Sequence, residues 1–236
     1  MSFTNLEWFT IYLSFFFCTF LFFSNACYVF FLKRNQVDIV EVSYLASIWK
    51  PLMSVNRNGI SYALGWIPLT SYVKPKGIEE ENNPLLFKVL LNTFGVFLLI
   101  FLASITYLSV KEAFTPYITL NCKIYDLILG NLDAQTFRTF YLSEMLIQPH
   151  YFAILFTYTL SLLLVGNLVV LFQKMNTVLG TVSSIALLLY YIMILYRLKV
   201  LLSFNIVLFF LLTQLVISAV YFGMSVLLIN NTQKSN

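Results

Sequence analysis

Five long apolar runs alternate with more polar segments along the chain. They cover residues 8–32, 89–110, 151–173, 178–196 and 200–229, and within these bounds none contains a charged side chain. About 20 apolar residues are needed to cross the roughly 30 Å hydrocarbon core of a bilayer, and the backbone of each crossing must satisfy its own hydrogen bonds. We therefore expect an all-α polytopic membrane protein with about five transmembrane helices, which forms a single membrane domain over residues 1–236.

The segment between the first two runs has the pattern of a small sheet instead of a plain loop. Residues 37–45 are rich in β-branched side chains, and residues 60–69 partly alternate between apolar and polar positions. Asn58 and Gly59 form the dipeptide that most strongly indicates a two-residue hairpin turn. Pro68 cannot donate to a sheet ladder, so it indicates an edge or a strand end, and Pro84 suits the first turn of the next helix. We expect a β-rich insertion over residues 37–74, at the membrane surface between helices 1 and 2.

The segment 111–150 is mixed and aromatic, and we expect it to be interfacial. Within it, residues 134–147 place Phe137, Phe140, Tyr141 and Met145 at helical spacing. This amphipathic stretch either lies in the plane of the membrane interface or packs within the protein.

The composition agrees with a membrane protein. Hydrophobic residues make up 60% of the 236 residues and charged residues 10%, against about 25% charged in a soluble domain. The net charge of +4 is therefore a sign of membrane orientation and not of nucleic-acid binding. Nine basic residues fall on one side of the five spans and five on the other, which predicts an outside N-terminus and places segment 33–87 on the matrix or cytoplasmic side. The nine are Lys33, Arg34, Lys50, Arg57, Lys74, Lys76, Lys88, Lys174 and Lys234; the five are Lys111, Lys123, Arg138, Arg197 and Lys199.

The chain offers little that points to catalysis, and we predict no catalytic residue, metal or cofactor. Gln214 is the most polar residue at the centre of a span, and we expect it to make a hydrogen bond between helices. His150 is the single histidine, too few for a bis-histidine haem or multi-histidine metal site. Axial ligation shared with a partner chain stays open for it, although a surface or interface role is favoured. Cys18, Cys27 and Cys122 form no C-x-x-C pair and suit small apolar fillers.

A resemblance to a known family begins at Ile67–Lys74, IPLTSYVK. It is similar to the I-P-L-G-G-Y-V-K element of the site-2 intramembrane metalloproteases, and its scaffold positions are Pro68, Tyr72 and Lys74. The order of the surrounding features also agrees over roughly residues 24–105. They are an R-R-x-G-V-like Lys33–Val37, a hairpin-strand stretch Gly59–Tyr62, the acidic Glu79–Glu81, and the start of the second span from Phe87 to Leu98. The resemblance implies an outside N-terminus and a membrane-associated sheet after the first span.

The chain departs from that family at the zinc site. The family's H-E-x-x-H motif falls on Ser24–Tyr28, SNACY, where both histidines are replaced and Asn25 cannot act as the general base. The family's later N-x-x-P-x-x-x-x-D-G stretch is matched best by Asn167–Asn176, with Val170 and Met175 in place of the proline and the aspartate. The resemblance therefore implies a degenerate, zinc-less relative, in which Ser24, Asn25, Tyr28 and Met175 are vestigial zinc-motif positions.

These features predict a non-catalytic structural or accessory subunit of a large inner-membrane complex. A mitochondrial respiratory-chain or ATP-synthase assembly is the favoured host, because frequent Phe, Tyr, Leu, Ile and Asn without an import-type N-terminus are typical of an organelle-encoded protein. The alternative is an intramembrane pseudoprotease that binds single-span client proteins. An active zinc protease is rejected on the replaced ligands.

Two kinds of partner are expected: membrane lipids and other membrane subunits, with no nucleic acid. Lys33, Arg34, Lys88 and Lys174 are candidate contacts for anionic lipid headgroups, although snorkelling at helix ends explains them as well. A quinone-, ion- or lipid-handling protein would need a polar or cavity-lining stripe, and the sequence reasoning finds none.

Overall fold

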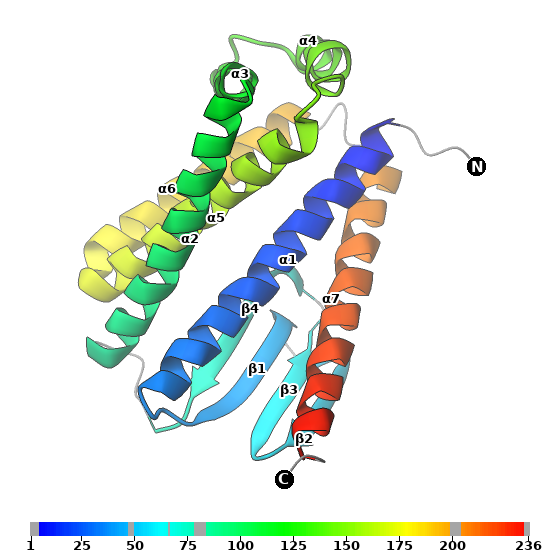
Figure 1. Ribbon diagram of the computed structural model, residues 1–236. Helices are drawn as coiled ribbons and strands as arrows, with labels where there is room; N and C mark the ends of the chain where they lie inside the picture. The colour runs from blue at the N-terminus through cyan, green and yellow to red at the C-terminus, as the bar shows by residue number, and fades with distance from the viewer. Residues whose placement is uncertain (1–4, 47–49, 66, 78–83, 199–203, 234–236) are drawn as a thin grey trace. The chain divides into compact units, whose positions relative to one another are not determined.

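The computed structural model describes residues 5–46, 50–65, 67–77, 84–198 and 204–233 (Figure 1). Glu79–Glu81, Lys199 and Lys234, which the sequence analysis used, lie outside the described residues. The chain divides into two compact units, one of residues 1–6 and 94–207, the other of residues 7–93 and 208–236. We describe each unit by itself.

The second unit contains a four-stranded sheet that follows helix α1 (Asn5–Arg34), which confirms the predicted insertion. Its strands have the spatial order β2-β3-β1-β4. Strand β1 pairs in parallel with β3 and antiparallel with β4, while β2 and β3 form an antiparallel hairpin. The strands are β1 (Ile39–Ala46), β2 (Met53–Arg57), β3 (Ile60–Leu64) and β4 (Ile67–Pro75).

The hairpin turn lies at the predicted dipeptide. Asn58 and Gly59 both have positive φ, 52° and 76°, as a type I′ turn requires, and Arg57 is paired with Ile60. The run predicted over residues 60–69 is divided between β3 and β4. Pro68 lies in β4, an edge strand of the sheet, which is where proline is tolerated.

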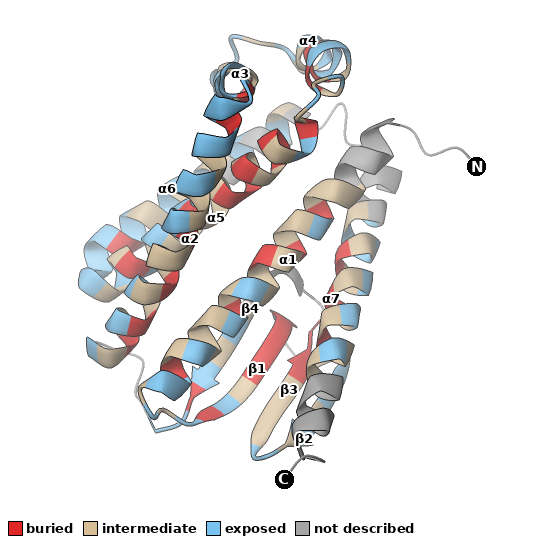
Figure 2. Ribbon diagram, viewed as in Figure 1, coloured by how far each residue is buried: buried red, intermediate tan, exposed pale blue. Residues whose placement is uncertain are grey.

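Helices α2 (Pro84–Val110) and α7 (Phe204–Gln233) complete this unit with their residues up to Thr93 and from Leu208. Helix α2 begins at Pro84, as predicted. In Figure 1, α7 runs beside α1, and the sheet lies near the C-terminal half of α1. Apolar side chains from α1, the sheet, α2 and α7 form one buried cluster. Its members are Leu32, Ile39, Val42, Tyr44, Leu45, Leu64, Leu86, Val89 and Phe222. Figure 2 colours the buried positions along these elements red.

In the first unit, the segment predicted as interfacial forms two helices and a short π-helical turn. They are α3 (Phe114–Leu129), α4 (Ala134–Phe140) and the turn η1 (Tyr141–Met145). Asp133 caps α4 by accepting from the backbone N–H groups of Gln135 and Thr136. Phe140, Tyr141 and Met145 are buried, and the Tyr141 hydroxyl is hydrogen-bonded to that of Tyr151. The amphipathic face predicted over residues 134–147 therefore packs within this unit.

Helices α5 (Tyr151–Met175) and α6 (Thr177–Leu198) form a tight helical hairpin in the same unit. Asn176 links them, and its side chain accepts from the backbone N–H groups of Val178 and Leu179. Across the hairpin, the Gln173 amide donates to Ser184 Oγ at 2.7 Å. A Cβ on Gly180 would come within 2.3 Å of Gln173 Cα, so glycine is what allows the two backbones to approach there.

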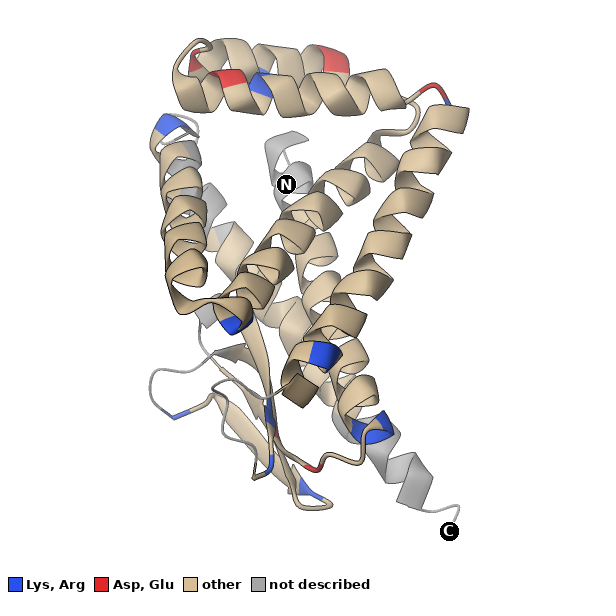
Figure 3. Cartoon of the chain, turned by 90° about the vertical axis from the view of Figure 1, so that its left-hand side faces the viewer, with Lys and Arg blue, Asp and Glu red and all other residues tan. Residues whose placement is uncertain are grey.

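Within the described part of the chain, three helical segments are long and apolar enough to cross a membrane: Ile11–Arg34, Pro84–Val110 and Tyr151–Met175. The described parts of α6 and α7 add the shorter apolar segments Thr177–Tyr190 and Phe210–Ser225. Charged residues lie at helix ends, on α3 and α4 and on the sheet with its turns, and the lengths of α2, α5 and α6 are otherwise uncharged (Figure 3). The structure is thus that of a mostly helical protein compatible with integration in a membrane; the number five for its spans stays a prediction.

Candidate functional site

The SNACY segment lies in the C-terminal half of α1 and contacts the sheet. Asn25 is only 7% exposed. Its side-chain amide donates to the Ser43 carbonyl oxygen of β1 at 3.4 Å, and its side-chain oxygen accepts from Ser71 Oγ of β4 at 3.3 Å. One carboxamide therefore connects the helix to two strands, while Ser24 and Tyr28 are half-buried nearby on α1.

A line of polar contacts continues from this point between α1 and α7. Thr19 and Tyr221 share a hydroxyl hydrogen bond of 2.7 Å. The Cys18 thiol, in turn, accepts from Ser218 and donates to the backbone carbonyl of Gln214, both at 3.8 Å. The Tyr44 hydroxyl of β1 donates to Ser225 Oγ of α7 at 2.7 Å. We call these residues the polar seam: Ser14, Cys18, Thr19, Asn25, Ser43, Tyr44, Ser71, Gln214, Ser218, Tyr221 and Ser225.

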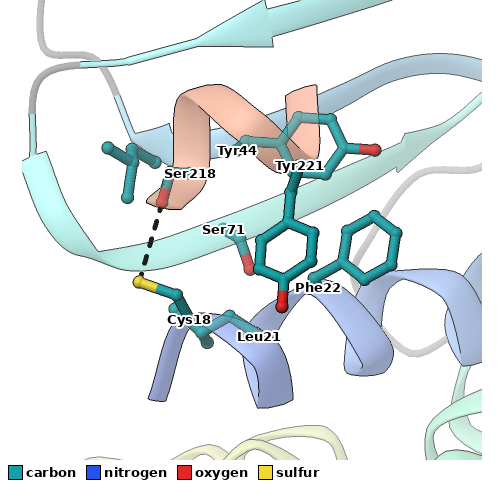
Figure 4. A pocket seen from close by; sticks show the side chains of 8 residues that line it. Cys18, Leu21, Phe22, Tyr44, Ser71, Ser218 and Tyr221 are labelled. Carbon is teal, nitrogen blue, oxygen red and sulfur yellow. Dashed lines mark hydrogen bonds between the residues drawn. The ribbon is translucent and has the colours of Figure 1, made fainter. Parts of the chain in front are cut away.

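A small pocket lies within the polar seam. Figure 4 shows Cys18 and Ser218 facing each other, with the rings of Phe22 and Tyr221 beside them. Those two rings are stacked, with centroids 4.5 Å apart and planes 14° apart. The pocket has a volume of about 10 Å³, which is room for about one water molecule. It is a packing gap with mainly apolar walls and a few polar groups, too small for a substrate.

Gln214 is fully buried, yet neither its side-chain nitrogen nor its side-chain oxygen has a hydrogen-bond partner among the described residues. The same holds for the hydroxyl of Ser14. The hydrogen bond between helices that the sequence predicts for the Gln214 side chain is therefore not formed within the described part of the chain. Buried groups of this kind are normally satisfied by water or by another chain.

The sequence reasoning missed the polar seam, although the signal was present. Ser14, Cys18 and Asn25 are spaced by four and seven residues, and so are Gln214, Ser218 and Ser225. Positions with this spacing lie on one face of a helix. Each triplet alone is ordinary in a membrane helix. The two triplets indicate a polar contact between helices only when α1 and α7 are known to be neighbours.

The tyrosines of the sheet are neutral donors. Burial raises the pKa of Tyr44, its hydrogen bond to Ser225 lowers it by less, and the nearby Tyr62 raises it further. Burial also raises the pKa of Tyr72, and the Glu41 carboxylate, which accepts from Tyr72 at 2.7 Å, raises it again. The chemistry that this junction provides is therefore neutral hydrogen bonding between helix, sheet and helix.

None of the remaining predicted residues belongs to the polar seam. Met175 is 65% exposed at the end of α5 in the other unit, and Lys174 beside it is half-buried. Lys74 is exposed on β4, and Pro68 lies on the same strand. The basic residues Lys33, Arg34 and Lys88 are exposed near helix ends.

The His150 ring lies edge-on to that of Tyr107, with 5.9 Å between centroids. Cys18 is buried, Cys27 is half-buried and Cys122 is exposed. Within the described residues, no three His, Cys, Asp or Glu side chains gather around a point that a metal ion could occupy.

Comparisons of the chain with protein-family models, with curated proteins and with solved structures find no match.

Proposed function

We propose that this chain is a non-catalytic structural or accessory subunit of a large inner-membrane complex, a mitochondrial respiratory-chain or ATP-synthase assembly. The observation that carries the proposal is the role of Asn25. At the place where the resembling proteases hold a zinc motif, its carboxamide ties α1 to β1 and β4. A side chain that is buried and used in this way favours scaffolding over chemistry.

An apolar stripe along α6 supports a permanent helical partner. Large apolar side chains recur on this helix at successive spacings of four and three residues, the spacing by which two helices interlock. Each is between 49% and 74% exposed. The stripe, which we call the α6 stripe, consists of Val178, Val182, Ile185, Leu189, Ile192 and Tyr196. We propose that a transmembrane helix of another subunit packs on it.

The choice of host rests on composition. The chain contains 24 Phe and 15 Tyr, and charged residues make up 10% of it. This usage favours an organelle-encoded subunit. In the proposed orientation, the N-terminus lies outside and the sheet faces the matrix.

The second candidate function is a pseudoprotease that binds single-span client proteins. It is favoured by the position of β4 at an edge of the sheet, since an edge strand presents backbone groups to which a client segment can add. Tyr72 on this strand is 42% exposed and would lie beside an added strand.

Site-specific photocrosslinking distinguishes the two functions. A photoreactive residue is introduced at Val182 on the α6 stripe, or at Tyr72 on β4, in the native membrane. The subunit proposal predicts one dominant adduct of fixed mass from Val182. A ladder of many adducts from Tyr72, with none from Val182, would instead establish the client binder.

Metal analysis tests the non-catalytic part of the proposal. The purified chain alone is expected to contain far less than one zinc per molecule, because the replaced positions Ser24, Asn25 and Tyr28 supply no histidine. Stoichiometric zinc bound by the chain alone would overturn it.

A further inference from the structure

A larger cavity lies in the unit of α1, the sheet and α7, beyond Asn25 from the small pocket. Its volume is about 250 Å³. Helix α1 lines one side of it from Phe22 to Lys33, strands β1 and β3 line the other, and Ser225 of α7 contributes as well. All of these residues belong to one compact unit.

The walls of the cavity are mainly apolar. Phe22, Ala26 and Val29 face it from α1, and Val42 and Ile60 face it from the sheet. Val42 is buried, whereas Ala26 is exposed, so the cavity has an open side. Such walls favour a hydrocarbon chain over water.

Lys33 gives the cavity its charge. Among the described residues that line the cavity, Lys33 alone carries a full charge at neutral pH, and none is a carboxylate. The Lys33 side chain is exposed at the end of α1, and the phenol of Tyr62 lies on the sheet side as a further donor. A ligand that matches this lining has an apolar body and an anionic end.

The length of the cavity suits one leaflet of a bilayer. Phe22 and Lys33 are eleven positions apart, which is roughly 16 Å along a helix, about half of the roughly 30 Å hydrocarbon core. Helix α1 is one of the segments long and apolar enough to cross a membrane, and its terminal Lys33 and Arg34 are suited to the headgroup level. The cavity thus runs along the C-terminal part of α1 and ends at Lys33, which is suited to the headgroup level.

We propose that this cavity binds one acyl chain of an anionic phospholipid, with the lipid phosphate held by the Lys33 ammonium group. The volume is slightly below the roughly 300–1,000 Å³ of pockets that enclose a whole ligand, so the second chain remains in the bilayer. The site requires neither a partner subunit nor the function proposed above.

Native mass spectrometry of the full chain in a neutral detergent tests the site. The probes are phosphatidylglycerol and phosphatidylcholine with identical chains, and glycerol phosphate as the headgroup alone. We expect one phosphatidylglycerol to bind more tightly than phosphatidylcholine, and glycerol phosphate not to compete. Equal affinity for the two lipids, or displacement by glycerol phosphate, would overturn the proposal; the second result would indicate a free-anion site.

Two matched variants separate the cavity from general attraction to a basic helix end. Lys33→Gln is expected to weaken phosphatidylglycerol binding about fivefold, which corresponds to the contribution of one lysine near a membrane surface. The neighbouring Arg34 does not line the cavity, so Arg34→Gln is expected to change the binding less than twofold. Equal losses in the two variants would contradict the site.

A third variant tests whether the acyl chain enters the cavity. Ala26→Phe fills the cavity from its open side and is expected to abolish retention of phosphatidylglycerol. Undiminished binding with an unchanged thermal unfolding midpoint would contradict the proposal. If this variant unfolds, the comparison of Lys33→Gln with Arg34→Gln decides alone, because both residues are exposed at the helix end.

Discussion

At the residue scale, Asn25 shows how a position that resembles part of a catalytic motif can serve packing. Its carboxamide both donates and accepts, so it satisfies one group on each of two strands. The sequence predicted that Asn25 could not act as a base. It did not predict the bonds to Ser43 and Ser71, because these depend on how the sheet lies against α1.

Asn25→Ala is expected to destabilise the folded chain by about 1–2 kcal/mol, because it leaves the Ser43 carbonyl and the Ser71 hydroxyl without this partner. The measurement is the free energy of unfolding in detergent. Asn35→Ala is the matched control. Asn35 follows α1 directly and its amide donates only locally, to the Phe31 carbonyl at the end of that helix, so its loss is expected to be smaller. Equal losses in the two variants would count against a bracing role for Asn25.

Tyr44 makes the stability of the sheet unit depend on alkaline pH. Burial raises its pKa above the ordinary value of 10.0, so the folded state retains a proton that the unfolded state loses. This contribution to stability is complete below pH 10 and is lost as the pH rises through the raised pKa.

We therefore expect the unfolding midpoint to fall as the pH rises above 10, and to fall less steeply in Tyr44→Phe. Tyr125→Phe, which changes a phenol that is 60% exposed on α3, is the control and is expected to keep the wild-type slope. Identical slopes in wild type and Tyr44→Phe would contradict this assignment.

At the element scale, the sequence predicted the types and boundaries of helices and strands better than it predicted which strands pair. The five apolar runs correspond to α1, α2, α5, α6 and α7, and the Asn58–Gly59 dipeptide is at its hairpin. The parallel pairing of β1 with β3 could not be read from periodicity, since alternation along a strand does not name its neighbour. The π-helical turn after α4 also could not be predicted from the spacing of apolar residues.

The α5–α6 hairpin provides a test of close packing. Gly180→Ala would push a Cβ against the backbone of Gln173 and is expected to cost about 2 kcal/mol or more, measured as the free energy of unfolding. Gly166→Ala on α5 is the control, because nothing lies within 4 Å of its added Cβ. Alanine is the better helix former, so that variant is expected to be neutral or slightly more stable. A neutral Gly180→Ala would show that the helices do not approach so closely.

At the scale of the whole molecule, the account predicts five spans and one orientation. Single cysteines placed at Ser2 and at Ser235, in a background without Cys18, Cys27 and Cys122, are tested with a membrane-impermeant thiol reagent on intact mitochondria or cells. Ser2→Cys is expected to react from outside and Ser235→Cys only after the membrane is opened. Reaction of both from the same side would require an even number of spans.

The central claim is that this chain serves as a permanent subunit and not as an enzyme. The most direct measurement is native gel electrophoresis of membranes solubilised in a mild detergent, with the chain detected by an antibody or a tag. The chain is expected to migrate with a respiratory-chain or ATP-synthase complex, at a mass far above its own 27.3 kDa. Migration only as a small free species, under conditions that leave those complexes intact, would contradict it.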